Sequence, residues 1–215
     1  MKIFAVLLAV HLVFSCTNES KGNRPVVADS SVKEEDRPEA DLSKITVKAE
    51  EALKFCVSKK LNTDFCILID MSLHSGIKRF FVWDFKTKSV VKRYLVGHGC
   101  GANPWSADGS KDNPQFSNED GSHLSSLGKY KLQGRGHSEW GIHVKYLMHG
   151  LEETNSNALK RFIVFHSWDQ MNDNEVFPKG SPEGWGCPTV SNNAMKEMDP
   201  MIQKSRKPVL MWIYE

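Results

Sequence analysis

The sequence lacks the motifs that three broad classes of protein require. It has no H-E-x-x-H and no C-x-x-C, and His143 and His149 lie six residues apart, so nothing indicates a zinc hydrolase or another metal centre. Its 28 Lys and Arg against 26 Asp and Glu give a net charge of only +2, without the basic stripe that binding to a nucleic-acid backbone requires. It shows no internal repeat. We therefore expect no metal and no nucleic-acid partner.

Long apolar runs are scarce, and the longest lies at the N-terminus. It extends from Ile3 to Phe14 behind Met1-Lys2, which is typical of a secretory signal and too short to cross a bilayer stably as a helix. The segment Leu12-Val13-Phe14-Ser15-Cys16 resembles a bacterial lipobox, in which the cysteine becomes the lipidated N-terminus of the mature chain. We therefore expect a signal peptide at residues 1–15 and a lipid anchor on Cys16. The alternative is a signal peptide cut elsewhere, which leaves Cys16 as a plain thiol.

Such an anchor predicts where the protein resides. Lipid chains on one residue hold a protein on a membrane surface without a spanning helix. We expect the anchor to be the protein's only contact with a membrane. The predicted location is the periplasmic side of the cell envelope, with the outer membrane as the favoured site.

Large apolar residues are nearly absent from residues 16–41, which are rich in Ser, Glu, Asp, Lys, Asn and Pro. Such a segment buries too little surface to fold and predicts a disordered tether. Residues 42–215 are long enough for one domain with its own core.

Cysteine is infrequent, with five residues in the chain. Export places them in an oxidising compartment, where pairs can form disulfides. With Cys16 assigned to the lipid, Cys56 and Cys66 are a candidate disulfide across the short connection between a helix and a strand. The alternative is that both are small buried residues, since free cysteine is among the most buried types.

The pattern of the folded part predicts a mainly β domain. Ser43 is a candidate N-cap for a helix that ends before Asn62, and a second helix is expected at 193–205. Short runs rich in branched and aromatic residues predict strands at 65–70, 79–85, 90–96, 130–132, 161–165 and 209–214. Residues 97–128 form a long loop rich in Gly, Asn, Ser and Asp, and loops of this length usually serve a site.

Two segments predict nucleophilic chemistry. Ile163-Val164-Phe165-His166 is a strand ending in a histidine, and Glu183-Gly184-Trp185-Gly186-Cys187 follows about twenty residues later. A thiol needs a base to become an effective nucleophile, and imidazole suits that role. Glycines around Trp185 allow a tight turn whose amide groups can face a developing oxyanion. The pair predicts acyl transfer by Cys187 with His166 as base.

These segments resemble the YkuD-type L,D-transpeptidase catalytic domain, in the branch whose motif is SWGCP. The similarity covers residues 56–215 through ordered landmarks, among them Ser125-Ser126-Leu127-Gly128-Lys129-Tyr130, Val96-Gly97-His98-Gly99 and His166. It implies a β-sandwich or barrel with a few flanking helices and no cofactor. It also implies a substrate, the peptidoglycan stem peptide.

The resemblance assigns roles to individual residues. Cys187 attacks the carbonyl of the third stem residue, D-alanine leaves, and an amine, water or a free D-amino acid resolves the acyl-enzyme. His166 is base and then acid, a backbone group of Ser167 orients it, and the amides of Gly186 and Cys187 form the oxyanion hole. The chain departs from the common pattern at Trp185, where histidine is usual, and at Thr189, where arginine or asparagine is usual.

Five residues are candidates for contact with substrate: His98, Ser126, Gly128, Trp185 and Thr189. Four of them have a plainer interpretation: a satisfied histidine for His98, turn-forming preferences for Ser126 and Gly128, and space filling for Trp185. Cys100, in His98-Gly99-Cys100, is a rival nucleophile, although no upstream histidine at a strand end accompanies it.

Two other functions remain open at this point. Water in place of an amine turns the same acyl-enzyme into an L,D-carboxypeptidase or peptidase. A disulfide between Cys187 and Cys100 would instead give an inactive envelope-binding module.

Overall fold

The structure is a computed structural model that describes residues 37–215. The predicted signal peptide, the Cys16 anchor and most of the tether therefore lie outside the described residues. Within 37–215, no helix has both the length and the apolar character needed to cross a bilayer.

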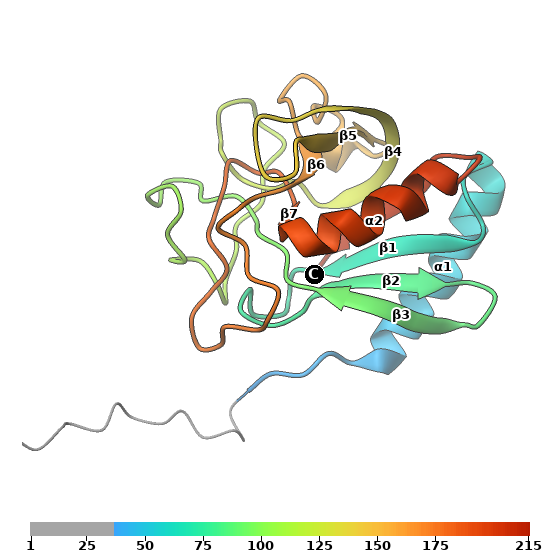
Figure 1. The fold of residues 1–215 in the computed structure, drawn as a ribbon, viewed down its shortest axis with the longest axis horizontal. Coiled ribbons are helices and arrows are strands. Elements are labelled where there is room, and N and C mark those ends of the chain that lie inside the picture. The colour runs from blue at the N-terminus through green and yellow to red at the C-terminus, as the bar shows by residue number, and fades with distance from the viewer. Residues whose placement is uncertain (1–36) are drawn as a thin grey trace, which may run out of the picture. The chain divides into compact units, whose positions relative to one another are not determined.

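One eight-stranded sheet forms the body of the domain, with strand order β3-β2-β1-β8-β4-β5-β6-β7. The strands β1, β2 and β3 lie side by side in Figure 1. The strands are β1 (Phe65–Asp70), β2 (Phe80–Asp84), β3 (Ser89–Tyr94), β4 (Gly128–His137), β5 (Val144–Gly150), β6 (Val164–Ser167), β7 (Thr189–Val190) and β8 (Val209–Tyr214). The pairs β1–β8 and β6–β7 are parallel, and the other neighbours are antiparallel.

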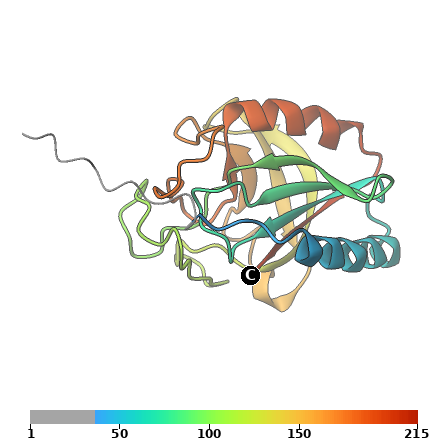
Figure 2. The same ribbon diagram turned by 90° about the horizontal axis from the view of Figure 1, so that it is seen from below.

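Two α-helices cover opposite faces of β1–β3, which lie between them in Figure 2. The helix α1 (Leu42–Lys59) begins one residue before the predicted cap: Asp41, not Ser43, is the N-cap, because its carboxylate accepts hydrogen bonds from the amides of Ser43 and Lys44. The helix α2 (Asn192–Lys204) is capped by Ser191. A short 3₁₀ helix, η2 (Glu153–Asn155), follows β5.

Alternation along β1 divides the core into two clusters. Ile67 and Ile69 point into the larger cluster, which α2 covers, while Cys66 and Leu68 point toward α1. The rings of Phe80 in β2 and Phe165 in β6 stack at 5.7 Å, although these strands are far apart in the sheet order. The sheet therefore curls into a near-barrel, and the prediction of a mainly β domain with few flanking helices is confirmed.

The candidate disulfide between Cys56 and Cys66 is not formed. Both residues are free thiols with no exposed surface, packed in the cluster between α1 and the sheet. Burial raises the pKa of each thiol, which keeps both protonated. They serve as small core residues, the second of the two alternatives.

Candidate active site

The strand β6 presents His166 at the centre of the site. The Nδ1 atom lies 2.9 Å from the carbonyl oxygen of Ser167, so Nδ1 carries the proton and Nε2 is left as the basic nitrogen. The ring is only 7% exposed, and this burial lowers the pKa of His166, while the hydrogen bond to Ser167 acts in the opposite direction. The imidazole is therefore neutral at pH 7.

The segment before Cys187 turns tightly at Gly186, where φ is +96°. A Cβ atom there would lie 2.5 Å from the carbonyl oxygen of Leu124, so only glycine fits. The hydroxyl of Ser125 donates to the Gly186 carbonyl at 3.1 Å and accepts from the Gly99 amide at 3.1 Å. Ser125 thus fixes the orientation of the peptide group that carries the Cys187 amide.

That turn leaves the amides of Gly186 and Cys187 without a backbone acceptor in residues 37–215. Two such amides beside a nucleophile are the donors that an oxyanion requires.

The thiol of Cys187 is half-buried and held by backbone groups. The amide of Val164 donates to Sγ at 3.4 Å, and the thiol donates to the carbonyl oxygen of Phe162 at 3.8 Å. Burial raises the pKa of Cys187, against smaller opposing effects of the Val164 amide and the charges of Arg161 and Lys145. Cys187 and His166 line the same cavities, but in this structure the thiol points to Phe162 and not to the imidazole.

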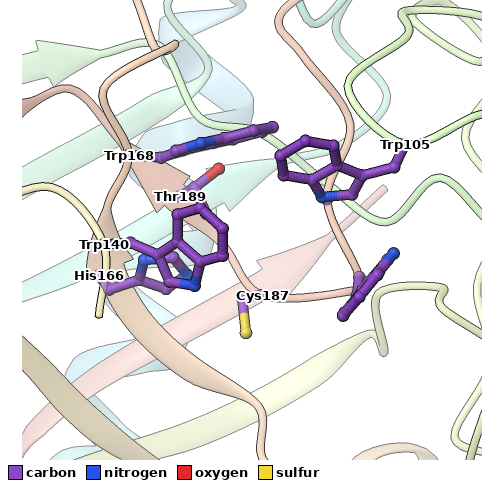
Figure 3. Close-up of a pocket in the computed structure, with 8 residues that line it drawn as sticks. Trp105, Trp140, His166, Trp168, Cys187 and Thr189 are labelled. Carbon is purple, nitrogen blue, oxygen red and sulfur yellow. The ribbon is translucent and has the colours of Figure 1, made fainter. Parts of the chain in front are cut away.

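Two cavities meet at Cys187 and His166. The first, of about 280 Å³, is walled by indole rings (Figure 3), and its lining contains no Asp, Glu, Lys or Arg side chain. Trp105, Trp140 and Trp168 lie on one side of Cys187, with ring centroids 5.0 to 6.4 Å apart. Trp185 stacks on His123 at 5.3 Å.

The second cavity, of about 420 Å³, has a charged lining. It shares Trp140, His166, Trp185 and Cys187 with the first and adds Lys145, Arg161, Asp120 and Glu139. Cys187 therefore lies between an apolar cavity and a polar one, so two chemically different groups could be held on either side of its thiol.

His98 does not line either cavity, contrary to the prediction. It has no exposed surface: Nδ1 accepts from Arg79 at 2.8 Å, and Nε2 donates to the hydroxyl of Ser110 at 2.8 Å. Ser110 in turn donates to the buried carboxylate of Glu183 at 2.9 Å. Burial and the charge of Arg79 lower the pKa of His98 to about 2, so this histidine is neutral. It connects Arg79 to Ser110 through its two ring nitrogens.

Ser126 and Gly128 also lie outside both cavities. The hydroxyl of Ser126 donates to the Ser117 carbonyl and accepts from Arg161, so it stabilises the loop that precedes β4. Gly128 has φ +125° and lies against the side chain of Asn155. Its role is therefore to allow this backbone conformation and this close approach. Trp185 and Thr189 do line the apolar cavity, although the hydroxyl of Thr189 is buried without a partner.

Sequence reasoning missed Ser125 and three of the four tryptophans. Ser125 is adjacent to Ser126, the predicted residue, and nothing local distinguishes the two. The tryptophans carried a signal, because Trp105, Trp140 and Trp168 all lie in loops, where binding residues are often found.

The rival nucleophile Cys100 is poorly placed for chemistry. It is 4% exposed, its thiol donates to the Gly101 carbonyl at 3.7 Å, and it lines neither cavity. Cys187 and Cys100 are both free thiols, so the disulfide of the inactive alternative is not formed. Among residues 37–215 no group of three or more His, Cys, Asp or Glu side chains is arranged to hold a metal ion.

The family follows from the sequence as a whole. A family model described as L,D-transpeptidase catalytic domain matches residues 37–214. The chain belongs to the L,D-transpeptidase catalytic domain family. A search of the curated proteins found no match.

Solved structures similar to this transpeptidase-family domain include three from bacteria. Bd1075 from Bdellovibrio bacteriovorus is 17% identical, with 72% of this chain and 49% of that chain covered and a TM-score of 0.40. The helical cell shape determining protein Pgp2 from Campylobacter jejuni is 12% identical, with 70% and 47% covered and a TM-score of 0.43. An L,D-transpeptidase from Xylanimonas cellulosilytica is 11% identical, with 75% and 68% covered and a TM-score of 0.38. This transpeptidase-family chain covers about half the length of the first two.

Proposed function

We propose that this domain is a cysteine acyltransferase that acts on peptidoglycan stem peptides. Cys187 forms an acyl-enzyme with the third stem residue, D-alanine leaves, and an amine acceptor resolves the thioester. The observation that carries the proposal is the meeting of two unlike cavities at Cys187 and His166, beside two amides with no backbone acceptor.

The first half of the reaction makes the thioester. The thiol turns from the Phe162 carbonyl toward Nε2 of His166, which takes its proton as Sγ bonds to the scissile carbonyl carbon. The carbonyl oxygen becomes an oxyanion, which the amides of Gly186 and Cys187 stabilise. When the carbon–nitrogen bond breaks, Nε2 gives its proton to the leaving amine of D-alanine.

The second half of the reaction uses the same groups. The acceptor amine attacks the thioester carbonyl, and Nε2 takes a proton from it. The carbon–sulfur bond breaks, and that proton returns to the thiol of Cys187. The carbonyl of Ser167 keeps Nδ1 protonated throughout, so the same nitrogen serves both halves.

The decisive experiment follows protein and product masses with a disaccharide tetrapeptide. We expect wild type to lose D-alanine from the substrate and gain a peptide adduct. Cys187→Ala should form no adduct, and His166→Ala should acylate about 10² to 10⁴ times more slowly. Cys100→Ala is the matched control and should behave like wild type.

The products then identify the second step. Cross-linked dimers support the transferase, whereas tripeptide alone indicates the L,D-carboxypeptidase. If wild type under reductant gives no adduct and releases no D-alanine, the proposal for stem tetrapeptides is overturned, and the inactive binding module becomes the better account.

The proposal also includes the cellular location of the protein. A protein that modifies peptidoglycan must be exported, and the apolar run before Cys16 supports export and lipid anchoring on the periplasmic side of the cell envelope.

A further inference from the structure

Two cations line the charged cavity, Arg161 and Lys145, and they differ in whether protein oxygens occupy their donors. The guanidinium of Arg161 donates to four oxygens of the neighbouring loop, those of Ser117, Ser122, Leu124 and Ser126. Of the two acids, Asp120 lies 3.9 Å from Lys160 and Glu139 lies 3.5 Å from His137. Within residues 37–215 the ammonium of Lys145 forms no salt bridge, although it lines the cavity.

Lys145 is also the cross-strand neighbour of His166. The register of β5 and β6 pairs the two residues directly. Side chains paired in this way leave the sheet on the same face, with Cβ atoms about 4.5–5.5 Å apart. The charge of Lys145 lowers the pKa of His166 and of Cys187, as expected of an ammonium close to both.

The apolar cavity offers no alternative cation, and in the charged cavity the donors of Arg161 are occupied by loop oxygens. Four indoles wall the apolar cavity, and its polar side chain Thr189 is uncharged, with its hydroxyl buried. A substrate carboxylate in either cavity would therefore meet Lys145 as the one cation free of a protein partner in the described part of the site.

We propose that Lys145 binds the terminal carboxylate of the D-alanine that leaves. His166 must reach the nitrogen of that residue to protonate it, and the carboxylate carbon is two bonds from that nitrogen. A cation that leaves the sheet beside His166 is therefore at the right place for the carboxylate. The assignment rests on the proposed function and deepens it: Lys145 selects stem peptides that end in a free carboxylate over chains in which that carboxyl is capped or continued.

The test compares two donors that differ only in this charge. One is a disaccharide tetrapeptide with a free terminal carboxylate, and the other carries a terminal D-alaninamide. The rate of Cys187 acylation is measured without acceptor for wild type, Lys145→Gln and Lys145→Arg. Lys160→Gln, which removes an exposed cation at the edge of the same region, is the matched control.

Wild type should prefer the carboxylate donor by about tenfold or more in kcat/KM, mainly through KM. Lys145→Gln should reduce the preference to near unity by losing efficiency on the carboxylate donor, Lys145→Arg should retain most of it, and Lys160→Gln should match wild type. The ratio between donors is the informative quantity. Partial unfolding, or a changed thiol pKa, affects both donors alike and leaves it unchanged.

Two outcomes would contradict the proposals, and they differ in which proposal they overturn. If wild type acylates without preference, or if Lys145→Gln keeps the wild-type preference, the Lys145 assignment is overturned while the acyltransferase stands. If wild type acylates with neither donor, the proposed function itself fails and the assignment fails with it.

Discussion

The protonation states of Cys187 and His166 follow from their burial. Removal from water raises the pKa of the Cys187 thiol and lowers the pKa of the His166 imidazole, because in each case burial penalises the charged form. At pH 7 the pair is therefore a neutral thiol beside a neutral imidazole. Because the thiolate is the reactive form of cysteine, a neutral thiol reacts slowly with oxidants and alkylating agents.

This state predicts the pH dependence of alkylation. The rate constant for Cys187 with iodoacetamide should still be rising at pH 8.5, the usual cysteine pKa, because burial raises the pKa of this thiol and the thiolate fraction is still increasing there. Mass spectrometry of the Cys187 peptide between pH 6 and pH 10 measures it, with glutathione as reference and Cys187→Ala to account for the other thiols. A plateau below pH 7 would mean a stable thiolate–imidazolium pair and would contradict the prediction.

At the scale of elements, the segment that carries Cys187 is anchored by the strand and the helix that come directly after it. Pro188 and the two residues of β7 connect Cys187 to Ser191, the N-cap of α2, and β7 pairs with β6. The hydroxyl of Ser191 accepts from the Ala194 amide at 3.1 Å and donates to Asp173. One serine therefore caps α2 and ties it to the loop after β6.

Loss of this cap should destabilise the domain. Ser191→Ala removes an acceptor for the first turn of α2 and a donor to Asp173, and we expect the free energy of unfolding to fall by about 1–2 kcal/mol. Urea unfolding followed by circular dichroism measures it. Ser58→Ala, an exposed serine in α1 that donates to the Phe55 carbonyl, is the control and should stay within about 0.5 kcal/mol of wild type. Equal decreases in the free energy of unfolding for Ser191→Ala and Ser58→Ala would contradict the capping role of Ser191.

Across the whole domain, the two faces of one sheet contribute side chains to two hydrophobic clusters. The strands β1 and β8 send alternate side chains into the cluster under α2 and into the cluster under α1. Neither cluster can lose its packing without disturbing the strands that the other cluster needs. We therefore expect both clusters to unfold together.

Two core substitutions test this coupling. Ile67→Ala opens a cavity in the larger cluster and Leu68→Ala in the smaller, and each should lower the free energy of unfolding by about 2–5 kcal/mol. Calorimetry should show one transition for wild type and both variants, shifted to lower temperature in the variants. Separate transitions, with each variant moving only one of them, would show that the clusters are independent.

Local pattern predicted much of the fold. The strands β1 and β8 were predicted at their observed bounds, because each is a continuous run of apolar, branched and aromatic residues buried on both faces. The strand β5 was missed even though Val144, Tyr146 and Met148 alternate in burial, because lysine, histidine and glycine interrupt the short run. The strand β6 begins three residues later than predicted, after Phe162, whose φ of +55° breaks the extended chain.

For the site, the sequence alone determined the residue types, and only the tertiary structure decided their partners. A histidine at a strand end and a cysteine between a glycine and a proline are local signals, and they led to His166 and Cys187. The burial of His98 depends on Arg79 and on Glu183, which lie 19 and 85 residues away, and the choice of Ser125 over Ser126 depends on which hydroxyl faces Gly186. The pairing of Lys145 with His166 depends on strand register. Contacts of this kind exist only after the chain has folded, because long-range packing brings the partners together and no local pattern records it.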